Sequence, residues 1–161
     1  MVSAQFRQGD NLSLSYLCFM GACPGRNEGI ERRPFSPNGN AGRSLRVLVR
    51  VLSEVYPDRF LSERLDDYSL LNAHPTPRPR GTPKHSAIAS PENRSHLAHL
   101  VSPLGNALEV ICLGRDAEFA ATHALKNARV LLSLPHPTSR TVNSKRRGSW
   151  ELNWRAWLEE S

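Results

Sequence analysis

A loop rich in glycine and proline, residues 21–42, limits what this chain can fold into more than any other stretch. Glycine reaches backbone angles that are closed to other residues and proline fixes φ, so their density here specifies a defined loop. The apolar run before it, residues 14–20, is rich in strand formers and too short to cross a membrane. After it, apolar residues recur at helical spacing from Leu45 to Leu52. A strand therefore leads into the loop and a helix leads out, as at the ligand-binding edge of a parallel sheet.

The rest of the chain alternates between strand-like apolar runs and helical patterns. Strands are expected at about residues 14–21, 66–72, 108–113 and 130–134, and helices at about residues 41–56, 93–108, 116–126 and from 150 onward. Pro103 is expected to kink or end the second helix, Ser149 to cap the last one, and the tryptophans of that last helix to pack in the core. Residues 1–13 show no pattern and are interpreted as a loose lead-in. This order predicts an α/β fold, a three-layer α/β/α sandwich whose central, mainly parallel sheet has four strands, in a single domain over residues 1–161.

Three of the expected strands end in a polar or glycine-containing motif, which begins at Gly21, at Asn72 and near His136. Because parallel strands share one carboxyl edge, we expect these motifs to converge on one site. Phe35 stands in the loop at that edge, where no core pattern requires an aromatic residue. The residues alone thus predict a ligand-binding α/β domain.

The charge of the chain favours a polyanionic partner. Lys and Arg total 21 against 15 Asp and Glu, a formal net charge of +6. The segment 74–91 combines a high density of proline with the cations Arg78, Arg80 and Lys84, and is interpreted as an exposed basic loop without helix or central strand. It is either a flexible linker or a contact for a phosphate backbone.

The cysteines and the hydropathy pattern exclude several other classes. The chain has three cysteines, an odd number without a CxxC pair, so neither a disulfide framework nor a zinc site is expected. Cys18 and Cys112 lie in apolar runs and are interpreted as core residues. We find no signal-peptide pattern and no long apolar run, so a cytoplasmic protein without a membrane partner is expected.

The loop and the later strand ends together resemble a known family. The pattern Gly21-x-x-Pro24-Gly25-x-x-Glu28, then Arg33-Pro34-Phe35-x-x-x-Gly39-x-Ala41-Gly42-x-x-Leu45, resembles the first motif of the uracil-DNA glycosylase superfamily, in particular of its bacterial and archaeal branch. Similar stretches follow in the same order: Leu70-Leu71-Asn72, Leu113-Gly114-Arg115 and Pro135-His136-Pro137-Thr138-Ser139. The resemblance spans about residues 15 to 145. It implies a DNA glycosylase, which flips a base out of the stack and cuts its N-glycosidic bond.

The resemblance also implies roles for single residues. Phe35 matches the phenylalanine that stacks on the base, and Asn72 the asparagine that binds the base edge. His136 matches the histidine that donates to the pyrimidine O2 as negative charge develops there. The plainer alternatives are a turn residue at a strand end for Asn72 and a structural histidine for His136. Several relatives hold an iron–sulfur cluster on four cysteines; with three, this chain is expected to hold no such cluster and no other cofactor or metal.

One departure concerns catalysis. Relatives place a carboxylate or an amide in the two positions after the first glycine, and here these are Ala22 and Cys23. The candidates to replace that group are Glu28 and Asn27, although Glu28 is equally well explained as tying the loop through backbone N–H groups. Gly25 stands where strict uracil enzymes have a bulky tyrosine, which leaves space beside C5 of the base. A uracil or a modified pyrimidine, including a C5-modified base of phage DNA excised in defence, is therefore compatible with the site.

The expected contacts with DNA lie around this edge. They are the cations and hydroxyls Arg43, Arg78, Arg80, Lys84, Thr138 and Ser139, with Arg140 at the position of the wedge that fills the space left by the flipped base. Arg43, Arg46 and Arg50 share the polar side of the first helix, and a solvated face is the alternative for them.

Three functions remain open at this point. The first is a monofunctional glycosylase, preferred over a lyase because no lysine occupies a motif position where it would form a Schiff base. The second is a catalytically inactive DNA-binding module of the same fold, consistent with Ala22 and Cys23. The third is a small nucleotide-binding α/β enzyme in which the basic charge is incidental. A monomer is expected for a protein that wraps a DNA strand.

Overall fold

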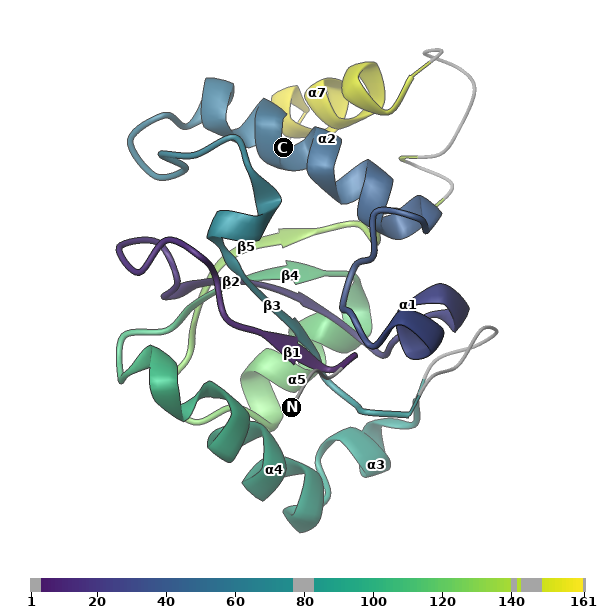
Figure 1. Ribbon diagram of the computed structural model, residues 1–161, viewed down its shortest axis with the longest axis vertical. Coiled ribbons are helices and arrows are strands. Elements are labelled where there is room, and N and C mark those ends of the chain that lie inside the picture. The colour runs from purple at the N-terminus through teal and green to yellow at the C-terminus, as the bar shows by residue number, and fades with distance from the viewer. Residues whose placement is uncertain (1–3, 77–82, 140–141, 143–148, 161) are drawn as a thin grey trace.

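The structure, a computed structural model of the chain, describes residues 4–76, 83–139, 142 and 149–160, without the side chains of Arg26 and Asn27. Its centre is a sheet, and helices cover both faces of that sheet (Figure 1). The predicted three-layer α/β/α arrangement is therefore confirmed.

The sheet differs from the prediction in its number of strands. Within the described part of the chain it has five strands in the order β1-β3-β2-β4-β5: β1 (Phe6–Arg7), β2 (Leu17–Gly21), β3 (Ser69–Asn72), β4 (Glu109–Leu113) and β5 (Arg129–Leu134). The last four are mutually parallel, and β1 pairs antiparallel with β3. The interpretation of residues 1–13 as a loose lead-in is wrong, because β1 lies within them. A two-residue edge strand is too short to show a hydrophobic period, so only its pairing with β3 reveals it.

The helices fall close to the predicted positions, with two additions. They are α1 (Arg26–Glu31), α2 (Asn40–Val55), α3 (His85–Ile88), α4 (Pro91–Val101), α5 (Arg115–His123) and α7 (Trp150–Glu159), with short 3-10 turns η1 (Leu65–Asp67) and η2 (Ser102–Leu104). Pro103 lies in η2, so α4 ends before it, as expected. Ser149 caps α7 by accepting from the Leu152 N–H at 3.2 Å.

The two additions correct the sequence interpretation. The loop 21–42 contains α1, and the segment 74–91 contains α3, although no helix was expected in either. Helix α3 lies between Pro83 and Pro91, where the chain has no proline to interrupt it, and its Ile88 is buried in the core. A high proline density averaged over a whole segment therefore does not exclude a short helix in a part of it that has no proline.

Two hydrophobic cores, one on each face, hold the layers together. Helices α2 and α7 cover one face and α4 and α5 the other (Figure 1). Strand β2 supplies both cores alternately: Phe19 packs with the first group and Met20 with the second. Trp154 of α7 is fully buried, and its indole N–H donates to the Ser44 carbonyl of α2 at 3.2 Å, which confirms its predicted core role.

Cys18 and Cys112 are buried in the second core, as predicted. Burial raises the pKa of both thiols, that of Cys112 to about 12. In the part of the chain that the structure describes, no helix is long and apolar enough to cross a membrane.

Candidate functional site

The carboxyl ends of the parallel strands place the three predicted motifs at one edge. Gly21 at the end of β2 is the register partner of Asn72 at the end of β3. Gly114, directly after β4, lies beside His136, which follows β5: a Cβ added to Gly114 would be 3.5 Å from the His136 Cβ. The order β3-β2-β4-β5 thus sets Asn72, Gly21 and His136 along a single edge of the sheet. The three motifs therefore lie along one edge, as the parallel order predicts; that they form one site stays a prediction.

Phe35 and Asn72 meet directly over Gly21. A Cβ added to Gly21 would lie 2.7 Å from the Phe35 Cζ and 2.9 Å from the Asn72 Oδ1, distances that real Cβ atoms do not tolerate. Glycine is therefore required here because two side chains occupy the space above it. Phe35 adopts the left-handed conformation (φ 49°), which is uncommon for a bulky residue and indicates that its surroundings hold it there.

Phe35 is also a core residue, which the sequence interpretation did not foresee. Its side chain is 2 % exposed and packs with the core between the sheet and α2. The expectation that no core pattern requires this aromatic is wrong, since the ring closes the end of the core at the edge of the sheet. Stacking on a base therefore requires a local rearrangement that uncovers one ring face.

The amide of Asn72 has a fixed orientation. Its Nδ2 donates to the Ala4 carbonyl at 3.0 Å, and its backbone N–H donates to the Gln5 carbonyl at 2.7 Å. These contacts come from the N-terminal segment, and they point Oδ1 over Gly21. Asn72 is 1 % exposed, so its amide is set by tertiary contacts rather than by a turn. The arrangement presents an acceptor beside the Phe35 ring.

Glu28 ties the two ends of the loop together. Its Oε1 accepts from the Phe35 N–H at 2.7 Å and its Oε2 from the Gly25 N–H at 2.9 Å, the latter closing a capping box on α1. Burial raises the pKa of Glu28, against the opposing effect of the hydrogen bonds from the Phe35 and Gly25 backbone and from the Asn72 side chain. Of the two explanations for Glu28, the structure shows the contacts of the loop tie. A catalytic role for Glu28 stays a prediction, as does that for Asn27, whose side chain lies outside the described part.

His136 is held as a neutral imidazole with a defined tautomer. Its Nδ1 accepts from the Thr138 backbone N–H at 3.2 Å and lies 2.8 Å from the Thr138 Oγ1. A backbone N–H only donates, so Nδ1 carries no proton and the ring proton sits on Nε2. Burial lowers the pKa of His136, which keeps the ring neutral near pH 7. The site therefore offers an Nε2–H donor at the end of β5.

Three predicted base-binding residues line the start of the loop. Ala22 and Cys23 follow Gly21 directly and are half-buried, and the Ala22 carbonyl accepts from the His74 N–H at 2.9 Å. A Cβ on Gly25 would lie 2.9 Å from the Glu28 Oε2, and among the side chains that the structure describes it would meet only that carboxyl group within 4 Å. Glycine at position 25 thus leaves room for the Glu28 carboxylate to reach the Gly25 N–H.

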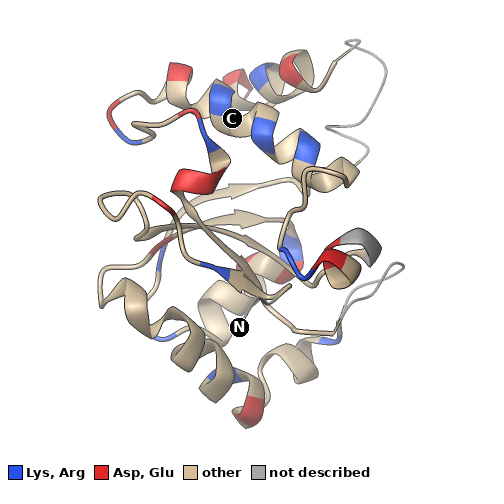
Figure 2. Ribbon diagram, in the orientation of Figure 1, with Lys and Arg blue, Asp and Glu red and all other residues tan. Residues whose placement is uncertain are grey.

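The predicted DNA contacts are only partly placed. Arg43, Lys84 and Thr138 are exposed, as contact with DNA requires, and Figure 2 shows basic residues spaced along α2. The hydroxyl of Ser139 is buried, and within the described residues it has no hydrogen-bond partner. Arg78, Arg80 and Arg140 lie outside the described part. Within that part, no group of three or more His, Cys, Asp or Glu residues is placed to hold a metal ion.

Arg46 and Asp66 belong to the surroundings of the site, and sequence reasoning missed both. A solvated face is wrong for Arg46: its side chain is 26 % exposed, lies 3.6 Å from Asp66 and donates to the Phe35 carbonyl at 2.8 Å. Arg50 pairs with Glu151 of α7 at 3.5 Å. Helical spacing predicts that these arginines share one polar side, but it does not predict their partners, Asp66 and Glu151, which are distant in the sequence.

The fold and this edge define a mainly parallel α/β protein with an aromatic ring, an amide acceptor and an imidazole donor along one edge of the sheet. The sequence model of the Uracil DNA glycosylase superfamily matches residues 9–158, nearly the whole chain. The chain therefore belongs to the uracil-DNA glycosylase superfamily, whose members are in general DNA glycosylases, hydrolases that act on DNA. No curated protein gives a significant match to the chain.

Proposed function

We propose that the protein is a monofunctional DNA glycosylase that flips a uracil or a modified pyrimidine out of DNA, hydrolyses its N-glycosidic bond and leaves an abasic site. The observation that supports this most is the meeting of Phe35 and Asn72 over Gly21, with His136 two strands away at the same edge. A ring, an acceptor and a neutral donor are the groups that hold a pyrimidine by its face and its two polar edges.

The orientation of Asn72 suggests what its side chain reads. Because Nδ2 donates to Ala4, Oδ1 is the atom offered to a ligand, and it accepts a hydrogen bond. The N3–H of uracil and the exocyclic amino group of cytosine both present a hydrogen to such an acceptor.

His136 acts at the opposite edge of the base. As the bond between C1′ and the base nitrogen breaks, its electron pair moves into the base, and negative charge gathers on O2. The Nε2–H of His136 donates to that oxygen and stabilises the leaving group. Water adds to C1′ and loses a proton, the departing base takes up a proton, and the products are an abasic sugar and the free base.

The loop supplies the group that relatives place directly after the first glycine. Ala22 and Cys23 carry no carboxylate, so we assign that role to Glu28, whose charge would favour a positive sugar in the transition state, with Asn27 beside it. Gly25 leaves room at the C5 side, which supports a C5-substituted pyrimidine, such as a modified base of phage DNA removed in defence.

A second candidate, a catalytically inactive DNA-binding module, is favoured by one observation. Both carboxylate oxygens of Glu28 already accept from backbone N–H groups, and the two preceding motif positions are apolar or weakly polar. This module would bind a modified base without cutting it.

Excision measured on matched oligonucleotides separates the two candidates. The strands carry uracil, thymine opposite guanine, or 5-hydroxymethylcytosine, and alkali reveals abasic sites. We expect cleavage of at least one strand by the wild type, and losses of about a hundredfold or more in Asn72→Ala and His136→Ala. Matched controls are Asn106→Ala and His99→Ala, which remove an exposed asparagine and an exposed histidine elsewhere.

The opposite outcomes are equally clear. Binding of a modified strand without any cleavage would leave the inactive module. Equal losses in the control variants would mean that the losses in Asn72→Ala and His136→Ala are not specific to the site. Absence of measurable affinity for DNA would contradict both the glycosylase and the inactive DNA-binding module.

A further inference from the structure

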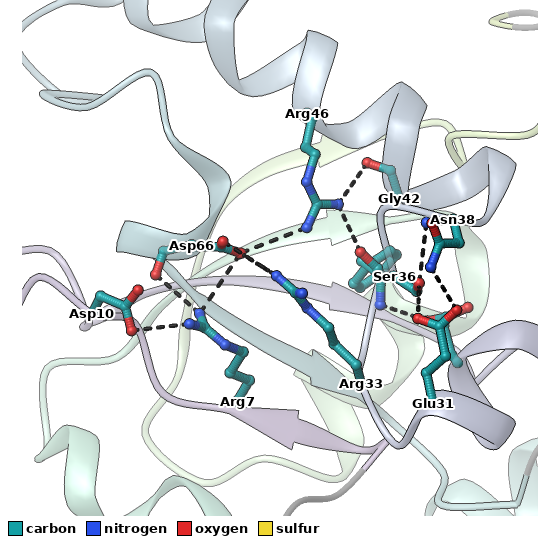
Figure 3. Close-up of polar contacts among 11 residues, drawn as sticks. Arg7, Asp10, Glu31, Arg33, Ser36, Asn38, Gly42, Arg46 and Asp66 are labelled. Atoms are coloured by element: carbon teal, nitrogen blue, oxygen red, sulfur yellow. Dashed lines mark hydrogen bonds and ion pairs between the residues drawn. The ribbon is translucent and has the colours of Figure 1, made fainter.

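Asp66, in the turn before β3, is surrounded by three arginines from three different segments (Figure 3). Its carboxylate lies 3.1 Å from Arg33, 3.6 Å from Arg46 and 3.8 Å from Arg7. Arg7 also donates to the Asp66 carbonyl at 3.0 Å and pairs with Asp10 at 2.9 Å. One carboxylate thus gathers β1, the glycine-rich loop and α2.

Two of these arginines connect Asp66 to Phe35. Arg46 donates to the Phe35 carbonyl at 2.8 Å and to the Gly42 carbonyl at 3.0 Å, so it spans the two ends of the turn between them. Arg33 stands two residues before Phe35, and its Nη2 contacts both oxygens of Asp66, at 3.1 and 3.2 Å. The segment that carries the ring is therefore bound to Asp66 from both of its sides.

The far side of the same segment is closed by a second set of contacts (Figure 3). The Glu31 carboxylate accepts from the Ser36 hydroxyl and, at 2.8 Å, from the Asn38 amide. Gly42 packs so closely on the segment that an added Cβ would be 1.9 Å from the Ser36 carbonyl oxygen. The segment has little room to move except at the Asp66 side, where its position depends on charge.

We propose that Asp66 is a positioning residue: through Arg33 and Arg46 it fixes the backbone of Phe35, and with it the position from which the ring turns one face toward the flipped base. This inference rests on the proposed function of the site. Asp66 itself touches neither base nor sugar, and it acts by fixing the backbone of the residue that does.

The charge balance explains why a single group has this effect. Without Asp66, the guanidinium groups of Arg7, Arg33 and Arg46 face one another, and Asp10 compensates only Arg7. The Arg46 Nη2 is buried, has no hydrogen-bond partner within the described residues and faces Asp66 at 3.6 Å, so loss of that carboxylate would leave its charge uncompensated there. The arginines would separate, and Arg33 and Arg46 would move the Phe35 segment with them.

Hydrogen exchange tests the positioning without relying on activity. Asp66→Asn keeps the shape and removes the charge, Asp66→Glu keeps the charge, and Asp10→Asn is the control that removes a carboxylate from the same cluster without touching Arg33 or Arg46. We expect faster amide exchange in Asp66→Asn over residues 33–42, unchanged exchange in β2 to β5, and partial restoration in Asp66→Glu. Unchanged exchange over 33–42, or equal acceleration throughout the sheet, would overturn the inference.

Excision then tests the consequence for the base, on whichever strand the wild type cleaves. Asp66→Asn is expected to lower the single-turnover rate by about tenfold or more while affinity for DNA stays within about twofold, because a misplaced ring harms orientation and not phosphate contact. Asp10→Asn is expected to behave as wild type, and an equal loss in it contradicts the proposal. If the wild type excises nothing, the proposed function fails, and hydrogen exchange still decides the role of Asp66.

Discussion

Two segments bring functional groups to the same edge in different ways. The glycine-rich loop delivers Phe35, and it is tied by Glu28, Arg33 and Arg46 to distant parts of the chain. The turn after β5 delivers His136, whose ring is held by Thr138, two residues later. The first segment is fixed by long-range contacts and the second by local ones.

The difference fits the roles that we propose for the two groups. A ring that stacks on a base must hold its plane and its depth, and both depend on the backbone that carries it. A histidine that donates a hydrogen bond needs the correct tautomer, and one backbone N–H on the other ring nitrogen is enough to set it. Substitutions in the loop should therefore affect the fold and the site together, whereas substitutions in the turn should affect mainly the chemistry.

The largest effect is expected from Gly42→Ala in the loop. The added Cβ would lie 1.9 Å from the Ser36 carbonyl oxygen and 2.5 Å from that of Phe35, and backbone atoms cannot give way cheaply. We expect a loss of about 3 kcal/mol in the free energy of unfolding, measured by urea denaturation. Asn40→Ala, at an exposed position two residues earlier, is the control and should change little. A loss below about 0.5 kcal/mol in Gly42→Ala would show that the loop is not held as described.

Glu28→Gln should have the next largest effect. The amide group has the same shape but only one acceptor oxygen, so either the Gly25 or the Phe35 N–H loses its partner. We expect a loss of about 2 kcal/mol in the free energy of unfolding. Glu63→Gln, at an exposed carboxylate, serves as the matched control. Wild-type stability combined with lost excision would mean that Glu28 serves the reaction and does not stabilise the loop.

The turn after β5, which carries His136, should affect how the free energy of unfolding depends on pH. The pKa of His136 is lowered by burial below its usual 6.5, so below that pH the unfolded chain binds the proton more readily than the fold does. The stabilisation from the neutral ring is present above pH 6.5 and is lost as the pH falls through the folded pKa. The contribution of this single group to the free energy of unfolding cannot change by more than about 1.4 kcal/mol per pH unit.

Unfolding of the wild type and of His136→Gln, followed from pH 8 to pH 5, measures this contribution. The difference between the two proteins should narrow as the pH falls. A difference that widens toward low pH would mean that the folded protein prefers the charged imidazole, against the tautomer described for the site.

The smallest effect is expected from Thr138→Val. The substitution removes the hydroxyl beside the His136 Nδ1 but keeps the backbone N–H that sets the tautomer. The excision rate should change by less than about fivefold, which corresponds to less than about 1 kcal/mol. A larger loss in rate would show that the hydroxyl, and not the backbone, orients the ring. A loss in DNA affinity without a matching loss in excision rate would instead reveal a phosphate contact.

The periodic pattern of the sequence was sufficient for most of the architecture. Alternating apolar runs and helical spacing predict the four parallel strands, the helices on both faces, and the burial of Trp154 and Cys112, because burial of a regular element leaves a local period. The polar strand ends predict which edge holds the site. Short elements such as β1, α1 and α3 leave no period and were missed.

What the sequence by itself determined is therefore which residues reach the edge: Gly21, Asn72 and His136 follow from strand ends and from the parallel order. Only the tertiary structure decided how they are held. Asn72 is oriented by Ala4, 68 residues away, and Arg33 is bound by Asp66, 33 residues away. Such contacts depend on where the folded chain brings distant segments together, and a hydrogen bond or an ion pair between them imposes no pattern on the neighbouring residues.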